Sequence, residues 1–96
     1  MARTSHLPQL ASTALGAMLA EAKHLEVSGS GLKDMTRLAL SSYDLWRDIL
    51  ATNSEHIGRA LAAYIQELEH IRENLRTRQL QEEFGRGAVA AARLRE

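Results

Sequence analysis

Residues 54–78, SEHIGRALAAYIQELEHIRENLRTR, form the most strongly patterned stretch of this sequence. Apolar residues recur along it in alternating steps of four and three, at Ile57, Leu61, Tyr64, Leu68, Ile71 and Leu75. A repeat of about 3.5 residues is typical of a helix that packs an apolar seam against another helix, with charged residues on its remaining faces. The stretch therefore predicts one long amphipathic helix over about 54–78.

The length of this predicted helix favours assembly with a second chain. Roughly 25 residues at about 1.5 Å each span about 37 Å. A compact monomer of 96 residues would have a diameter of only roughly 32 Å. The helix would extend beyond a compact monomer, and a partner chain that covers the extending part is the simplest explanation. We therefore predict an intertwined homodimer that pairs through the seam.

Shorter helices are expected on both sides of the long one. The first follows Pro8, whose missing N–H costs nothing in a first helical turn, and it runs through about Lys23 with an apolar stripe at Leu10, Ala14, Leu15, Met18 and Leu19. Glycine and serine at 27–31 then favour a turn. The other predicted helices cover about 32–40, 43–51 and 80–95. The sequence thus predicts an all-α fold of about five helices.

Two signals suggest where these helices begin. Ser41 and Ser42 precede the third helix, at positions where hydroxyl side chains commonly cap a helix. Thr52 and Glu55 have the spacing of a capping box in front of the long helix.

Composition restricts the classes of function. The 96 residues suit a single domain over 1–96, and 12 basic residues balance 12 acidic ones without a basic patch. A nucleic-acid interface and a polybasic membrane anchor are therefore not expected. The absence of cysteine excludes a disulfide framework and a thiolate zinc site. No apolar run is long enough for a signal peptide or a membrane span, so a cytoplasmic protein is expected.

Familiar catalytic and metal-binding patterns are not found. No two histidines stand three or four residues apart, as a helical metal site would need, and we expect the imidazoles of His24, His56 and His70 to be solvated. The turn Gly29-Ser30-Gly31 lacks the third glycine and the preceding strand of a dinucleotide-binding fingerprint. We therefore expect no catalytic, cofactor-binding or metal-binding residue in this chain.

One cluster of residues favours an anion site. The turn at 29–31 leads into a helix that carries Lys33 and Arg37 at a spacing of four. Helix N-termini attract carboxylates, and arginine binds a carboxylate through two parallel hydrogen bonds. The alternatives are that both cations are solvated or that Arg37 pairs with Asp34. Trp46, the single tryptophan, is expected in the core, where it can also wall a site.

Two segments together resemble the prephenate dehydrogenase family, which includes enzymes that use arogenate. The stretch Ser5-His6-Leu7-Pro8 is similar to the family's SHLPH segment. Residues 31–37, GLKDMTR, are similar to its G-(F/L)-(R/K)-D-x-T-R segment, and 46–49, WRDI, match a further one. Order and spacing fit over 4–53, and the remainder resembles the family in helical character only. Gln9 stands where the family often has a second histidine, so that side chain cannot carry charge.

The resemblance implies the C-terminal dimerisation and substrate-cleft domain of an NAD(P)-dependent oxidoreductase. Such enzymes convert prephenate to 4-hydroxyphenylpyruvate in tyrosine biosynthesis. Carried over by position, Arg37 would bind a substrate carboxylate, Lys33 would add positive charge, Trp46 would wall the cleft, and His6 and Gln9 would lie at it. The family's Rossmann domain, which would hold the nucleotide and the catalytic histidine, would lie before residue 1. The chain alone is therefore expected to bind no nucleotide and to catalyse nothing.

A different class of function fits the long helix equally well. A non-catalytic homodimerisation or protein-interaction module would use the 57–75 seam to pair with itself or with another chain. Such a module has no need of the cluster Lys33, Arg37 and Trp46, and this cluster is what favours the enzyme domain. A regulatory ligand-binding domain is a third class, and no feature of the sequence points to it.

Overall fold

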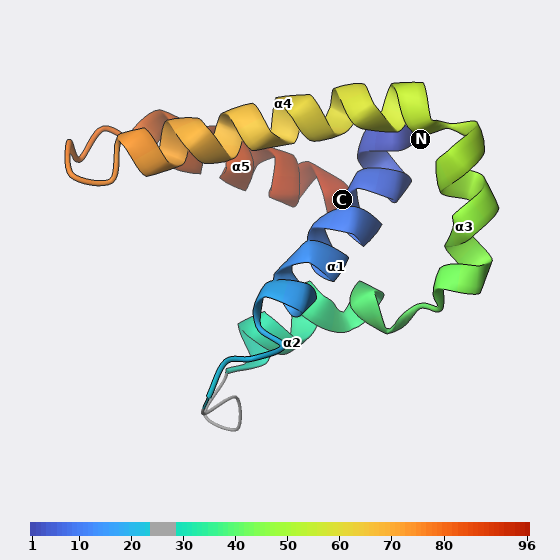
Figure 1. The fold of residues 1–96 in the computed structure, drawn as a ribbon. Coiled ribbons are helices and arrows are strands. Elements are labelled where there is room, and N and C mark those ends of the chain that lie inside the picture. The colour runs from blue at the N-terminus through green and yellow to red at the C-terminus, as the bar shows by residue number, and fades with distance from the viewer. Residues whose placement is uncertain (24–28) are drawn as a thin grey trace. The chain divides into compact units, whose positions relative to one another are not determined.

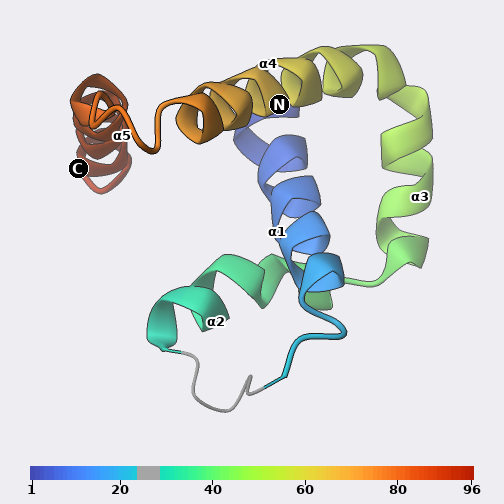
Figure 2. The same ribbon diagram turned by 60° about the vertical axis from the view of Figure 1, so that its left-hand side comes forward.

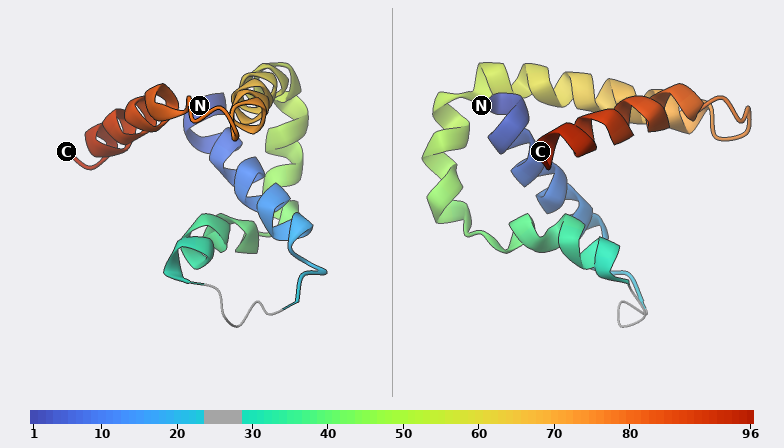
Figure 3. Two further views of the ribbon diagram at one scale, coloured as in Figure 1. Left: turned by 90° about the vertical axis from the view of Figure 1, so that its left-hand side faces the viewer. Right: turned by 180° about the vertical axis from the view of Figure 1, so that it is seen from behind.

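The computed structural model describes residues 1–23 and 29–96, and this part of the chain is built from helices joined by short turns (Figure 1). The elements are a π-helical turn η1 (Ala2–His6), helices α1 (Leu7–Met18) and α2 (Ser30–Thr36), a 3-10 turn η3 (Arg37–Leu40), and helices α3 (Tyr43–Thr52), α4 (Ser54–Glu73) and α5 (Gln81–Leu94). No strand occurs in these ranges, as the further views in Figure 3 also show. The predicted all-α class with about five helices is confirmed. His24 and the first part of the predicted 27–31 turn lie outside the described residues.

The chain forms two compact units, residues 1–61 and residues 62–96, and helix α4 contributes to both. In the first unit, helix α1 lies against α2 and η3 (Figure 2). The second unit contains the end of α4 and all of α5. None of the described helices is both long enough and apolar enough to cross a membrane.

The face of α1 that packs on η3 is polar and small. Gln9 and Ser12 are only 5% and 3% exposed, and both bond to the η3 main chain. The Gln9 Nε2 donates to the Leu38 carbonyl at 2.8 Å, and the Ala39 N–H donates to the Ser12 Oγ at 3.0 Å. A Cβ at Gly16 would lie 3.5 Å from the Ala39 Cβ, so the two segments approach closely. The predicted apolar stripe is therefore not the buried face of α1.

Helix α1 ends five residues earlier than predicted. Its last residue is Met18, which is exposed. The N–H of Leu19 is shared between the carbonyls of Leu15 and Gly16, at 3.2 and 3.1 Å, and the N–H of Ala20 reaches Ala17 at 3.3 Å. This shift to bonds over three residues tightens and ends the helix. Pro8 lies in the first turn, as predicted.

The predicted helix over 32–40 is two elements, α2 and η3. Helix α2 begins at Ser30 and ends at Thr36, whose hydroxyl donates to the Leu32 carbonyl at 2.8 Å. A hydroxyl bonded back in this way commonly bends a helix. Beyond Thr36, the N–H of Ala39 has Ser12 as its partner, a side chain outside the helix. Together these bonds account for the change from α-helix to 3-10 turn.

The start of α4 differs from the predicted capping box. The Thr52 hydroxyl donates back to the Asp48 carbonyl at 2.8 Å, so Thr52 belongs to the end of α3. The first main-chain bond into α4 runs from the Ile57 N–H to the Asn53 carbonyl at 2.9 Å. The predicted pairing of Thr52 with Glu55 is therefore wrong, because Thr52 is the last residue of the preceding helix.

Helix α4 has 20 residues and ends at Glu73, not at 78. The Asn74 side chain donates to the His70 carbonyl at 2.9 Å and occupies one of the terminal acceptors. Arg78 takes a left-handed backbone conformation, with φ of 62°, in the turn that follows. The seam residue Leu75 consequently lies outside the helix. At about 30 Å the helix no longer exceeds the diameter estimated for a compact monomer, so its length does not argue for a dimer.

Little apolar surface is buried within the described chain. Ile57 and Ala60 are its only buried hydrophobic residues. Leu68 and Leu75 of the predicted seam are 48% and 64% exposed. The other seam residues, Leu61, Tyr64 and Ile71, are half-buried. Seam residues that stay exposed along one segment are consistent with a surface that another protein covers.

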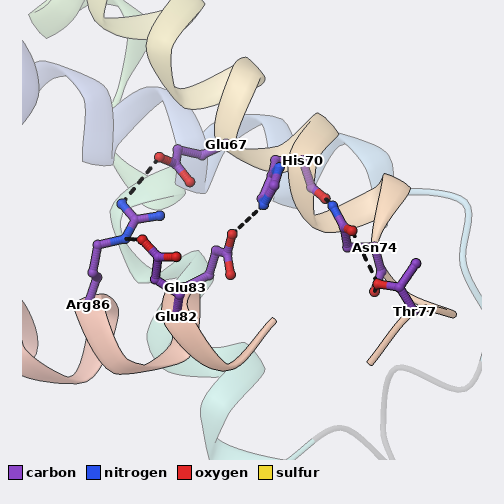
Figure 4. A network of polar contacts seen from close by, with 7 residues as sticks. All are labelled: Glu67, His70, Asn74, Thr77, Glu82, Glu83 and Arg86. Carbon is purple, nitrogen blue, oxygen red and sulfur yellow. Dashed lines mark hydrogen bonds and ion pairs between the residues drawn. The ribbon is translucent and has the colours of Figure 1, made fainter. Parts of the chain in front are cut away.

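Ionic contacts join α4 and α5 within the second unit (Figure 4). The guanidinium of Arg86 lies 3.5 Å from a carboxylate oxygen of Glu67 and 3.8 Å from one of Glu82. His70 contacts Glu83, whose side chain is only 10% exposed. His70 is exposed, as expected, and in addition contacts this carboxylate. His56 is exposed, as expected, and contacts Arg59.

Candidate functional site

A cavity of about 250 Å³ lies between α1 and α3 in the first unit. Figure 2 shows these two helices connected through α2 and η3. The cavity is lined on the α1 side by Gln9, Leu10 and Thr13, and on the α3 side by Tyr43, Trp46 and Leu50. Ala39 of η3 and the Ser41–Ser42 linker complete the wall. The lining combines apolar and polar side chains, as is usual for a small-molecule site.

The imidazole of His6 packs against the indole of Trp46 beside this cavity. The ring centroids lie 5.8 Å apart and the planes are nearly perpendicular, a favourable arrangement for aromatic pairs. His6 is 8% exposed. Its Nδ1 and the Trp46 Nε1 are both buried and have no hydrogen-bond partner within the described chain. Because a buried polar atom without a partner costs about 1–3 kcal/mol, these two nitrogens are unsatisfied groups beside the cavity.

The side chain of Gln9 is already engaged in the fold. Its Nε2 donates to the Leu38 carbonyl at 2.8 Å and to the Thr13 hydroxyl at 3.2 Å. A carbonyl oxygen can only accept, so the amide nitrogen must be the atom that faces Leu38. Both amide hydrogens are thereby used, and the remaining bonding group of Gln9 is its carbonyl oxygen.

Lys33 and Arg37 lie next to this cavity in sequence but do not line it. Lys33 belongs to α2, Arg37 is the first residue of η3, and both are exposed. The alternative pair of Arg37 with Asp34 is not formed in the described part of the chain. Arg37 lies two residues before Ala39, which does line the cavity. The structure thus brings His6, Gln9 and Trp46 together and places the two cations on the adjoining segment.

Ser12 is the residue that the sequence interpretation missed. It is more deeply buried than any predicted site residue, and it binds the main chain of the turn that carries Arg37. A signal was present, because Ser12 stands three residues after Gln9 and so shares its helical face. A polar pair at that spacing in a mostly apolar helix indicates a polar contact surface.

Comparison with known protein families gives a match over most of the chain. A family described as "Prephenate dehydrogenase, dimerization domain" matches residues 1–87. The match includes all of the residues that line the cavity, together with His6, Lys33 and Arg37. No solved structure matches this chain.

Proposed function

The chain belongs to the prephenate dehydrogenase dimerization-domain family, and from this premise we propose that it pairs two subunits and closes the substrate cleft of such an enzyme. Dimerisation is the function that the family carries. The substrate role rests on the cavity between α1 and α3 and on the cations beside it. The observation that carries this role is the contact between His6 and Trp46, in which the His6 Nδ1 and the Trp46 Nε1 are buried and have no partner in the described chain.

The dimer contact is proposed to involve the seam on α4. Three apolar residues of this region are about half exposed or more: Ile65, Leu68 and Leu75. Burial of these side chains between two chains would stabilise the dimer by about 25 cal/mol for every Å² of apolar surface removed from water. The half-buried Leu61, Tyr64 and Ile71 would extend this surface. A homodimer therefore satisfies the apolar surface that a single chain leaves open.

The substrate proposed for the cleft is prephenate or arogenate. Each carries carboxylates, and Arg37 would bind one of them while Lys33 adds positive charge. A hydrogen bond to a charged group contributes about 1.5–3 kcal/mol. Trp46 would wall the cleft, and the free ring nitrogens of His6 and Trp46 would bond to the substrate or to water held with it. Gln9 would lie at the cleft.

The nucleotide of the whole enzyme does not fit the residues described here. A dinucleotide site needs a strand, a glycine-rich turn and a helix, and residues 1–23 and 29–96 contain no strand. We therefore assign NAD(P) binding and the catalytic groups to a Rossmann domain preceding this one in the whole enzyme. By this assignment the chain is one part of a cytoplasmic oxidoreductase of tyrosine biosynthesis and is inactive alone.

The single tryptophan gives a direct test of the substrate role. In a ¹⁵N-labelled sample, Trp46 contributes one indole N–H signal, which we expect to shift on addition of prephenate at about 1 mM. Half-saturation at that concentration corresponds to a binding free energy of roughly 4 kcal/mol. The Arg37 Nε–H signal is expected to shift with it. Benzoate, an aromatic acid with one carboxylate, serves as the control and is expected to bind more weakly.

The alternative function is a pairing module without a substrate site. It would leave both signals unmoved while the chain remains dimeric by light scattering. That result would refute the substrate role and keep the dimerisation role. A shift with prephenate that disappears in Arg37→Gln would refute the alternative.

A further inference from the structure

Two buried side chains of α1 hold a single peptide group of η3. The carbonyl of Leu38 and the N–H of Ala39 belong to the same peptide unit. Gln9 donates to that carbonyl at 2.8 Å, and Ser12 accepts from that N–H at 3.0 Å. In a trans peptide the C=O and N–H point in opposite directions, so the unit is held from both sides.

The α1 side of these two bonds is shielded from water. Gln9 and Ser12 are the two buried residues of α1, and they lie one helical turn apart on the same face. The close approach of α1 at Gly16 keeps the two segments together, since a Cβ there would contact Ala39 at 3.5 Å. Buried hydrogen bonds are costly to leave unmade. The 38–39 peptide is therefore fixed in orientation.

The consequence concerns Arg37, which precedes the fixed peptide by one residue. A 3-10 turn of four residues has few internal bonds of its own, so the direction in which Arg37 leaves the main chain depends on what holds the turn. We propose that Gln9 and Ser12 are positioning residues, which orient Arg37 for carboxylate binding by clamping the 38–39 peptide. This inference rests on the substrate role proposed above.

The proposal gives Gln9 a task that differs from direct binding of a carboxylate. Its two amide hydrogens are bound to Leu38 and Thr13, so it has no donor left for an anion. It acts through the main chain instead. Preorganisation of a binding group in this way increases affinity because less conformational entropy is lost on binding.

Two substitutions and one matched control test the clamp. Ser12→Ala removes the acceptor of the Ala39 N–H. Gln9→Met removes the side-chain donor to the Leu38 carbonyl with little change in side-chain length, and leaves the Ser41 N–H, at 3.1 Å, as the other donor to that carbonyl. Thr13→Ala removes the exposed partner of Gln9 and leaves the clamp in place. Ser12→Ala is the milder change and keeps the test informative if Gln9→Met does not fold, which circular dichroism would reveal.

The first readout is amide hydrogen exchange at Ala39 in the full chain. Loss of one hydrogen bond is expected to speed exchange by about three- to tenfold in Ser12→Ala and to leave Thr13→Ala unchanged. The second readout is prephenate titration, followed at the Arg37 Nε–H and Trp46 indole signals. The clamp variants are expected to weaken binding by about three- to tenfold. In the Arg37→Gln background they should have no further effect.

Each result has a distinct meaning. Equal Ala39 exchange in wild type and Ser12→Ala would overturn the clamp. Faster exchange with unchanged prephenate binding would overturn its positioning role. A clamp effect that persists in Arg37→Gln would also overturn it, because the effect would not pass through Arg37. If wild type binds no prephenate, the substrate role fails and the positioning role fails with it, whereas wild-type binding with unaffected variants rejects the positioning role alone.

Discussion

The imidazole of His6 and the indole of Trp46 meet edge to face, with 5.8 Å between ring centroids. The two residues lie 40 positions apart in sequence and join η1 to α3. Each buries a ring nitrogen that has no partner in the described chain. The contact therefore combines favourable packing with two unmet hydrogen bonds, and these two effects respond differently to substitution.

Trp46→Phe is expected to separate packing from hydrogen bonding. Phenylalanine keeps an aromatic ring against His6 and removes the unpartnered N–H, so the free energy of unfolding should change by less than about 1 kcal/mol. Trp46→Ala removes the ring and should destabilise the chain by about 2–4 kcal/mol. Urea unfolding followed by circular dichroism would measure both. A loss in Trp46→Phe as large as in Trp46→Ala would mean that the indole N–H is bonded after all.

Arg37→Lys is expected to raise KM for the acid substrate in a dehydrogenase that contains this domain. Lysine keeps the charge but loses the two parallel hydrogen bonds of a guanidinium. A loss of about 1.4 kcal/mol in binding free energy corresponds to a tenfold increase in KM. Steady-state kinetics would give KM and kcat separately. Arg93→Lys, beyond the residues matched by the family, is the control. An unchanged KM in Arg37→Lys would remove Arg37 from the site.

Helix class and approximate positions follow from the sequence because they depend on local patterns. The apolar repeat from Ile57 to Ile71 and the turn signals around it depend only on neighbours along the chain, and α4 and α5 lie close to where they were predicted. Helix ends were less predictable. Thr52 has the chemistry to start one helix or to end another, and its bond to Asp48 decides between the two.

The candidate site was predictable only in part. Motif resemblance named His6 and Trp46, but their contact depends on packing between distant segments. Ser12 belongs to none of the segments that resemble the family, and its partner Ala39 lies 27 residues away. A local pattern cannot specify such a bond, because serine in a helix is usually solvated or bonded within its own turn.

Leu68→Glu is expected to dissociate the dimer. Leu68 is 48% exposed in the single chain, so the substitution should cost the monomer little. A carboxylate placed in an apolar interface should weaken pairing by about 2–4 kcal/mol, or roughly 30- to 1,000-fold in the dissociation constant. Light scattering over a dilution series would measure the mass. Glu69→Gln, on the neighbouring exposed position, is the control and should remain dimeric. A dimeric Leu68→Glu would place the interface elsewhere.

The contacts between α4 and α5 are expected to differ in strength according to the burial of their carboxylates. The side chain of Glu83 is only 10% exposed, and one of its carboxylate oxygens has no partner in the described chain. His70→Ala would remove the partner of the other oxygen as well. We expect a loss of about 1–3 kcal/mol. Arg86→Met removes contacts at 3.5 and 3.8 Å whose partners are half-exposed or more, and such surface pairs contribute only about 0–1 kcal/mol.

Amide hydrogen exchange along α5 would measure both variants, since α5 is held to α4 by these contacts. His70→Ala should speed exchange in the first turns of α5, and Arg86→Met should change it little. Glu83→Gln serves as a matched control, because an amide keeps the length of the side chain and can still bond to His70, now without a buried charge. Equal effects of His70→Ala and Arg86→Met would contradict the ranking, because burial of Glu83 would then contribute nothing to the attachment of α5.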